Sequence, residues 1–191
     1  MGANSKMYQG AWLDFNQVTY LDWPPYEGEA SLSELAKRVA THYRIKDNDI
    51  LIGSSMGGMV ALEISKLLYL ERVVLVGSAI DVSEMNSFLT LLTPFVDFAP
   101  IDFFQKLAGR HDSIFQQMFA SSDANFMRTM CRAISKWEGY PGNLTNVTRI
   151  HGEKDKVIKC PRDCHVIKRG GHLIPITHAR ECVDIIQRFI H

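Results

Sequence analysis

The chain has 191 residues, and its 21 basic side chains balance its 21 acidic ones. This length suits one domain with a substantial core, and the charge balance gives no reason to expect a nucleic-acid partner. No apolar run approaches the length of a membrane span, so we expect no membrane association. The four cysteines show no disulfide-rich spacing, which predicts reduced thiols and a cytoplasmic location.

The N-terminal part of the chain predicts short irregular pieces, one strand and one helix. Residues 1–16 are typical of loop at their start, with a short helical or irregular piece from Lys6 to Phe15. Residues 18–21 have the β-branched and aromatic composition of a strand, which two prolines end. Ser31, followed three residues later by Glu34, forms a capping box and predicts a helix that ends near Tyr43.

A strand, a tight turn and a helix follow, and this stretch holds the strongest chemical signal in the sequence. Residues 50–52 form a continuous aliphatic run, typical of a strand that is buried on both faces. From Met56 onward the residues favour a helix. Between the two lies the pattern Gly53-x-Ser55-x-Gly57.

The chemistry of a nucleophilic serine explains this spacing. The hydroxyl must be exposed to a base, and the oxyanion formed by its attack needs hydrogen-bond donors. A sharp strand-to-helix turn exposes Ser55 and lets the Met56 N–H donate to that oxyanion, at the positive end of the helix. Gly53 and Gly57 leave room for the turn between its neighbours. The alternative interpretation is a glycine-containing turn with a structural role only.

Further along the chain, the pattern predicts a parallel α/β sheet with a helical insertion. Residues 72–76 form another apolar strand, and strands that alternate with helices at these spacings indicate parallel pairing. From 81 to 140 the strand pattern stops, and we expect several short helices rich in phenylalanine. They either form a cap with an apolar pocket over Ser55 or simply pack against one another. The sequence therefore predicts a single domain over residues 1–191, with 81–140 as the cap.

Two more strands and a closing helix complete the predicted fold. The strand at 148–152 leads into a turn that carries Asp155. The strand at 165–168 is followed by two glycines and His172. We expect Thr177 to cap the closing helix, whose apolar residues form one stripe.

Three motifs in this order resemble the α/β-hydrolase superfamily. They are Gly-Ser-Ser-Met-Gly-Gly after a strand, His-Gly-Glu-Lys-Asp after a later strand, and Gly-Gly-His before the final helix. The resemblance implies an α/β fold with a mostly parallel sheet, shortened at the N-terminus, and a serine hydrolase without cofactor or metal. It also implies Ser55 as the nucleophile, Asp155 as the acid and His172 as the base.

Other interpretations apply to the acid and the base. Asp81 is the fallback acid, because some members of the superfamily place the acid after that earlier strand. Asp155 can instead be a turn aspartate that pairs in solvent with Lys154 and Lys156. His172 can be an ordinary loop histidine that follows two flexible glycines.

A cysteine-containing stretch offers a rival interpretation as a zinc site. Cys160, Cys164 and His165 are zinc-type ligands, and His151 precedes them. Paired zinc cysteines favour a two-residue spacing, and here three residues separate the pair, so we expect no metal. His151 is interpreted as a structural residue at the end of its strand.

Two features depart from the pattern of the superfamily. Its members carry further strands before an oxyanion loop, and here residues 2–5 resemble the end of that loop, so Met1 falls at the second oxyanion donor. The interval between Asp155 and His172 is too short for the usual helix between the last two strands. A sheet without its first strands exposes an unpaired edge, which pairing into a homodimer would cover.

The expected reaction is hydrolysis of a small-molecule carboxylic ester through an acyl-enzyme. A thioester or a small amide would use the same groups. The alternative is a non-catalytic or weakly active binding protein of the same fold, because loss of one oxyanion donor lowers kcat by about 10²–10³. Reaction of Ser55 with a fluorophosphonate distinguishes the two.

Overall fold

The computed structural model describes residues 4–86 and 123–190. In this part of the chain, four strands form a sheet with the order β1-β2-β3-β4. All three neighbouring pairs are parallel, which confirms the predicted sheet. The strands are β1 (Ile50–Ser54), β2 (Arg72–Val76), β3 (Val147–Gly152) and β4 (His165–Ile167).

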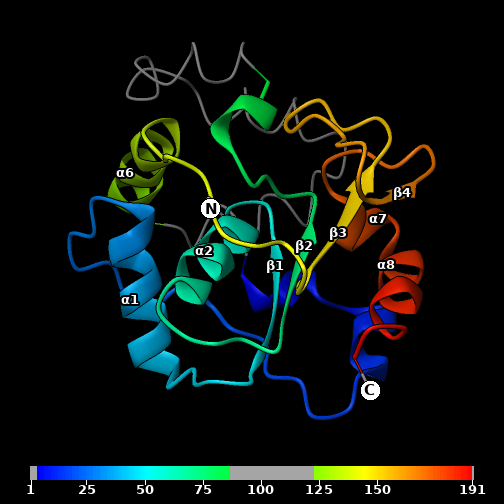
Figure 1. Cartoon of the computed structure of the whole chain (residues 1–191), viewed down its shortest axis with the longest axis horizontal. Coiled ribbons are helices and arrows are strands. Elements are labelled where there is room, and N and C mark those ends of the chain that lie inside the picture. The colour runs from blue at the N-terminus through cyan, green and yellow to red at the C-terminus, as the bar shows by residue number, and fades with distance from the viewer. Residues whose placement is uncertain (1–3, 87–122, 191) are drawn as a thin grey trace.

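Helices cover both faces of this sheet (Figure 1). One face carries α1 (Leu32–Tyr43), α2 (Met56–Ser65) and α6 (Ala124–Ser135), and the other carries α7 (Ile174–Thr177) and α8 (Ala179–Ile186). Short 3₁₀ helices span Ser5–Met7, Gly10–Asp14 and Val82–Glu84. Within the described ranges, no helix combines the length and the apolar character needed to cross a bilayer.

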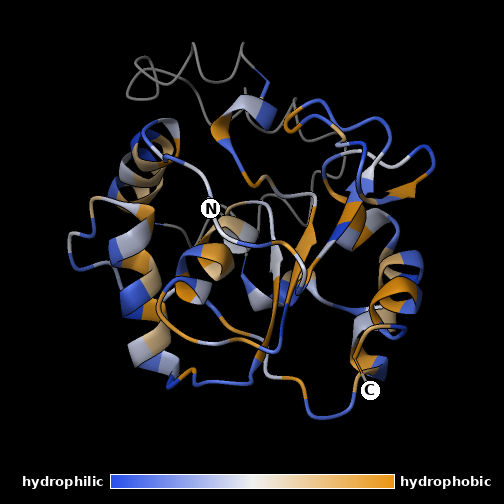
Figure 2. Cartoon of the chain, viewed as in Figure 1, coloured by the Kyte–Doolittle hydropathy of each residue, from blue (hydrophilic) through white to orange (hydrophobic). Residues whose placement is uncertain are grey.

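Strand β2 shows how the sequence builds two hydrophobic cores. Val73 and Leu75 belong to the core under α1, α2 and α6, whereas Val74 and Val76 belong to the core under α7 and α8. Successive side chains of a strand point to opposite faces, so a strand covered on both faces needs an unbroken apolar run. Figure 2 shows β2 in hydrophobic colours, with hydrophilic residues on the outer surface of α1.

Helix α1 begins where the capping box predicts. The Ser31 hydroxyl oxygen accepts a hydrogen bond from the Glu34 N–H at 3.1 Å. The Glu34 carboxylate accepts the N–H of Ala30 at 2.6 Å, one residue before the donor of a standard capping box. These two bonds satisfy backbone donors at the start of the helix.

The strand predicted at residues 18–21 is wrong: the segment forms no strand with any described residue. Aromatic side chains hold it instead. The Tyr20 ring stacks on Tyr8 with 5.6 Å between centroids, and the Tyr20 hydroxyl donates to the Trp12 carbonyl. The β-branched and aromatic composition therefore serves side-chain packing here rather than a strand ladder.

The predicted cap of the closing helix is also wrong. Thr177 Oγ1 donates to the Leu173 carbonyl at 3.1 Å, within the short helix α7. Helix α8 begins separately, after His178, which makes no side-chain capping bond. The sequence pattern does not separate these two helices, so the cap predicted for the second falls on a residue of the first.

Most of the expected helical cap, residues 87–122, lies outside the described residues, and the cap stays a prediction. The described part of this range includes α6, which contacts α1. Its buried Phe126 lies against the rings of Trp23 and Tyr26, each with 5.8 Å between centroids. Helix α6 therefore extends the core of α1 and α2.

Candidate active site

Ser55 lies in a strained turn between β1 and α2. Its backbone has φ 52° and ψ −123°, a combination that residues other than glycine rarely adopt. The Ser55 N–H donates to the Val76 carbonyl at 3.1 Å, and the Ser78 hydroxyl donates to the Ser55 carbonyl at 2.7 Å. Bonds to β2 and to the segment after it therefore hold the turn in place.

Close packing explains one of the two glycines predicted to be necessary. A Cβ on Gly53 would lie 2.3 Å from the Gly57 carbonyl oxygen, so a side chain does not fit there. A Cβ on Gly57 would have no described atom within 4 Å, so packing does not explain that glycine. The second tight position is Gly58, where a Cβ would lie 2.5 Å from Ser78 Oγ.

His172 lies between Ser55 and Asp155. Its Nε2 is 3.0 Å from Ser55 Oγ, and its Nδ1 is 2.9 Å from Asp155 Oδ2. The His172 side chain is 12% exposed, so it faces a partly open site. Ser55 follows β1, Asp155 follows β3 and His172 follows β4. The carboxyl ends of parallel strands share one edge of the sheet. The structure thus brings together the three residues that the sequence predicts.

The Asp155 carboxylate is buried, and both of its oxygens have hydrogen-bond donors. Its Oδ1 accepts the N–H groups of Val157 and Ile158 at 2.8 and 3.0 Å. Burial works to raise the pKa of Asp155, but hydrogen bonds from His151 and His172 outweigh it and hold that pKa well below its usual range. Asp155 is therefore an anion at neutral pH.

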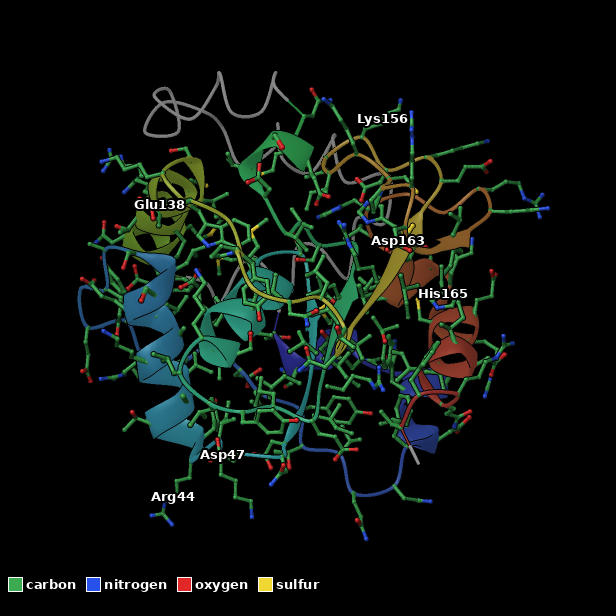
Figure 3. All side chains as sticks on the ribbon, viewed as in Figure 1. Arg44, Asp47, Glu138, Lys156, Asp163 and His165 are labelled. Atoms are coloured by element: carbon green, nitrogen blue, oxygen red, sulfur yellow. The ribbon has the colours of Figure 1, made fainter. Side chains whose placement is uncertain are left out.

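The alternative of a solvated ion pair at Asp155 is wrong. The carboxylate has no exposed surface, and its bonding partners are backbone N–H groups and histidines. Lys154 and Lys156 are both exposed, and Figure 3 shows Lys156 extending outward from its loop.

His151 is a contact of the site that the sequence interpretation missed. Its Nε2 lies 3.1 Å from Asp155 Oδ2 and 3.0 Å from the Ile158 carbonyl oxygen. A signal was present, because the His-Gly-x-x-Asp spacing joins the end of β3 to the turn that returns beside it. The residue predicted to be structural therefore touches the candidate acid.

Asp81 lies in a different environment from that expected of a fallback acid. Its Oδ1 accepts the Ser83 N–H at 2.8 Å and caps a 3₁₀ helix. The hydrogen bonds to Ser83 lower the pKa of Asp81. The acid that contacts the His172 ring is Asp155 rather than Asp81.

One of the two predicted oxyanion donors is within the described structure. Met56 is the first residue of α2. Its N–H is therefore one of the first N–H groups of the helix, which have no intrahelical acceptor. Met1 lies outside the described residues, and its predicted part in the site is untested. Ser5, at the end of the predicted oxyanion loop, donates its N–H to Asp22 Oδ1 at 2.6 Å.

The rival zinc ligands do not come together. Cys160 Sγ and Cys164 Sγ are 3.8 Å apart, but His151 contacts Asp155 and the His165 ring lies against Phe189. In the part of the chain that the structure describes, no three metal-ligating side chains form a group that could hold an ion. None of the four cysteines, all of which lie in the described ranges, forms a disulfide bond.

Comparison with known proteins identifies the family and the fold. A model of the alpha/beta hydrolase family matches residues 10–185, which is most of the chain. The chain belongs to the alpha/beta hydrolase family. A search of curated protein sequences gives no match to this hydrolase.

Solved structures share the fold of this hydrolase at low sequence identity. A lipase-esterase related protein from Clostridium acetobutylicum is 17% identical, with a TM-score of 0.74 over 99% of this chain and 90% of that one. The esterase EaEST from Exiguobacterium antarcticum is 15% identical, with a TM-score of 0.74 over 98% and 87%. A meta-cleavage product hydrolase from Pseudomonas fluorescens is 17% identical, with a TM-score of 0.69 over 97% and 84%. Identities this low show the shared fold alone.

Gly77 is a second residue of the hydrolase site that the sequence interpretation missed. It follows β2 with φ +57°, and a Cβ there would lie 3.1 Å from the His172 carbonyl oxygen. The same Cβ would come within 3.9 Å of both Asp155 Oδ2 and His172 Nδ1. Gly77 thus lets the end of β2 approach the His172–Asp155 pair.

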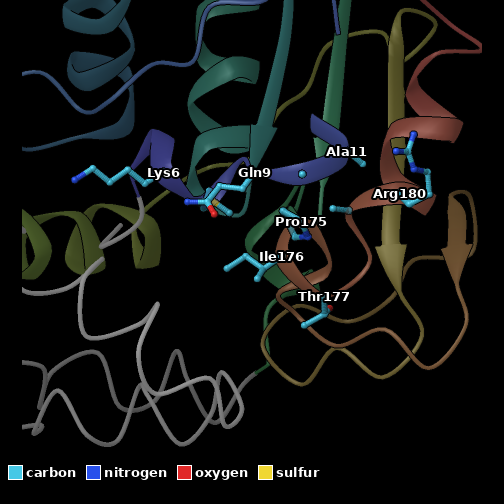
Figure 4. Close-up of a pocket in the computed structure, with 10 residues that line it drawn as sticks. Lys6, Gln9, Ala11, Pro175, Ile176, Thr177 and Arg180 are labelled. Carbon is cyan, nitrogen blue, oxygen red and sulfur yellow. The ribbon is translucent and has the colours of Figure 1, made fainter. Parts of the chain in front are cut away.

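A hollow of about 510 Å³ lies beside the N-terminal 3₁₀ helices (Figure 4). Lys6 and Gln9 line one side, and Pro175 and Arg180 line the other. Ser55, His172 and Asp155 are not among its lining residues. This hollow is therefore separate from the candidate active site.

Proposed function

We propose that this α/β hydrolase cleaves carboxylic esters through an acyl-enzyme formed on Ser55. The observation that carries the proposal is the continuous contact from Ser55 Oγ to His172 Nε2 at 3.0 Å and from His172 Nδ1 to Asp155 Oδ2 at 2.9 Å. Each link has the length of an ordinary hydrogen bond, along which a proton can be transferred.

The ionised carboxylate determines which nitrogen of His172 carries the proton. An anionic Asp155 accepts hydrogen bonds and donates none, so the neutral ring carries its hydrogen on Nδ1. Nε2 then has a free lone pair directed at Ser55 Oγ. His172 is thereby set to act as the base that takes the Ser55 proton as the hydroxyl attacks the ester carbonyl.

Charge in the tetrahedral intermediate would be stabilised from two directions. The imidazolium formed on His172 faces the Asp155 anion, which favours its positive charge. The oxyanion would meet the Met56 N–H at the start of α2, where the helix dipole also favours negative charge. His172 would then return its proton to the leaving alcohol, and Ser55 would keep the acyl group.

Deacylation would repeat these steps with water as the nucleophile. His172 Nε2 would accept a proton from water, and the acyl group would leave as a carboxylic acid while Ser55 regains its proton. The esterases among the structural neighbours support an ester substrate, and a thioester would use the same groups.

The test is a panel of p-nitrophenyl esters with acyl chains of increasing length. We expect hydrolysis of at least one ester and a mass increase of one acyl group on Ser55 when deacylation is slow. Ser55→Ala, which removes the nucleophile and should keep the fold, is the control and should show neither. Turnover that survives in Ser55→Ala would contradict the proposal, and a folded wild type without turnover would favour the non-catalytic binding protein.

A further inference from the structure

A second histidine shares the buried carboxylate with His172. His151 Nε2 lies 3.1 Å from Asp155 Oδ2 and 3.0 Å from the Ile158 carbonyl oxygen, and its side chain is 1% exposed. A carboxylate oxygen and a carbonyl oxygen are both acceptors. Nε2 must therefore carry a hydrogen, and the two acceptors share it.

The donors around Asp155 fill the hydrogen-bonding capacity of its carboxylate. Oδ1 accepts the N–H groups of Val157 and Ile158, and Oδ2 accepts the His172 N–H. Oδ2 also lies 3.1 Å from His151 Nε2, whose N–H it shares with the Ile158 carbonyl oxygen. An ionised carboxylate offers about four lone-pair sites, so none is left for water. Three of these donors come from β3 and the turn after it, and His172 provides the fourth.

We propose that His151 is a positioning residue of this hydrolase, which holds Asp155 Oδ2 against His172 and takes up part of the carboxylate charge. The proposal rests on the proposed function, because it assigns a role within the same site. A carboxylate that shares its charge between two donors stabilises a protonated His172 less than one that faces His172 alone. His151 thus favours the neutral form of the base, which accepts the proton of Ser55.

The other charged groups near this contact have partners or lie in solvent. Arg149, on the same face of β3 as His151, pairs with Glu84 at 2.6 Å. The two lysines beside Asp155 in sequence are exposed. Among the described residues, only the two histidines form ion-pair contacts with the Asp155 carboxylate.

A role limited to packing leads to a different expectation. Loss of a buried histidine that only fills space and bonds the Ile158 carbonyl would lower the free energy of unfolding. It would leave the pH dependence of Ser55 reactivity unchanged in the molecules that fold. The pH profile therefore separates a positioning role from a packing role.

The experiment compares His151→Gln with His151→Met. Glutamine can keep an N–H donor near the position of Nε2 and does not titrate, whereas methionine has a similar length and no donor. The readout is the rate constant for labelling of Ser55 by a fluorophosphonate, per folded molecule, from about pH 5 to pH 9.

We expect His151→Met to slow labelling at neutral pH about tenfold, because the carboxylate loses one charge-assisted hydrogen bond. The midpoint of its pH profile should move up by about half a pH unit or more, because Asp155 then favours the protonated base more strongly. His151→Gln should stay within about twofold of the wild type at neutral pH and keep the wild-type midpoint.

The control is Trp137→Phe, which removes a buried N–H donor to a different carboxylate, that of Glu63. It should leave the midpoint unchanged. Equal midpoints for the wild type and His151→Met would overturn the proposal, as would an equal loss in the methionine and glutamine variants. A wild type that is folded and unlabelled would instead refute the proposed function, and this inference with it.

The wild type provides a second test that does not depend on the folding of a variant. The ¹⁵N imidazole spectrum of His151 should show the hydrogen on Nε2 across the pH range of the labelling experiment. A neutral His151 ring with its hydrogen on Nδ1 and a bare Nε2 could not donate to Asp155. That spectrum would overturn the proposal.

Discussion

Two buried carboxylates, Glu63 in α2 and Asp155 after β3, have similar surroundings, but only Asp155 is linked through its partner to a candidate nucleophile. Glu63 is 5% exposed, accepts the Trp137 indole N–H at 2.7 Å and pairs with the Lys66 ammonium. The Asp155 side chain has no exposed surface and accepts the His172 N–H at 2.9 Å. Each carboxylate is paired and bonded to an aromatic ring nitrogen.

The difference lies in what the partner can do with a proton. The Trp137 indole and the Lys66 ammonium donate hydrogen bonds and accept none, so neither passes a proton on to a third group. Their bonds join α2 to the segment after α6. His172 has a second ring nitrogen, which contacts Ser55 Oγ. Burial and ion pairing therefore do not identify a catalytic acid by themselves. The distinguishing feature is a partner that can exchange a proton with a third group.

The largest effect is expected from removing the two groups that exchange this proton. Ser55→Ala and His172→Ala should each lower kcat/KM for the best ester by about 10⁴-fold or more. The double variant should lose little more, because the pair acts as one unit. Steady-state kinetics measure these losses, and urea unfolding checks that each variant is folded. Losses that multiply in the double variant would contradict the assignment.

The same amide substitution in the two carboxylates tests whether they differ in function. Asp155→Asn should lower kcat by about 10⁴-fold, because an amide can hold the imidazole in the wrong tautomer. Glu63→Gln should leave kcat per folded molecule unchanged and lower the free energy of unfolding by about 1–3 kcal/mol, since it breaks a buried charged contact. A loss of kcat in Glu63→Gln as large as that in Asp155→Asn would remove the distinction.

Asp81→Asn tests the choice of acid directly. Because Asp81 bonds the Ser83 N–H and Asp155 bonds His172, the Asp81 variant should keep kcat within about twofold of the wild type. Kinetics on the same ester provide the measurement. A nearly silent Asp155→Asn combined with a severe Asp81→Asn would show that Asp81 is the acid.

A smaller loss of activity than in Asp155→Asn is expected at Gly77, beside the His172–Asp155 pair. Gly77→Ala should slow turnover about tenfold, because its Cβ would press on the His172 backbone and misplace the ring. Gly10→Ala is the matched control: its φ is +61°, and its Cβ would have no described atom within 4 Å. Both variants should lose about 1 kcal/mol of stability from backbone strain. Equal turnover in the two variants would refute a positioning role for Gly77.

The parts of the site that could be predicted from the sequence are those fixed by local chemistry. The Ser55 turn follows from an apolar strand, a Gly53 without room for a side chain and a helix that starts at Met56. Asp155 and His172 each follow a strand, and parallel strands bring such positions to one edge. Their motifs could therefore be recognised without knowledge of tertiary contacts.

The parts that could not be predicted depend on contacts between distant segments. Residues 18–21 have the composition of a strand, but the Tyr20 ring packs on Tyr8 and no described strand pairs with the segment. The role of Gly77 depends on its approach to His172, which is far away in sequence. Only the contact of His151 with Asp155 is local enough that its spacing could have indicated it.

Activation of Ser55 by His172 and Asp155 can be measured by fluorophosphonate labelling. The reagent loses fluoride as an activated serine oxygen bonds to phosphorus, so labelling needs no knowledge of the natural substrate. Peptide mass mapping should find one adduct, on Ser55, that Ser55→Ala lacks and His172→Ala forms at least about 10³-fold more slowly. A folded wild type without this adduct, or with labelling that persists unchanged in His172→Ala, would show that His172 and Asp155 do not activate Ser55.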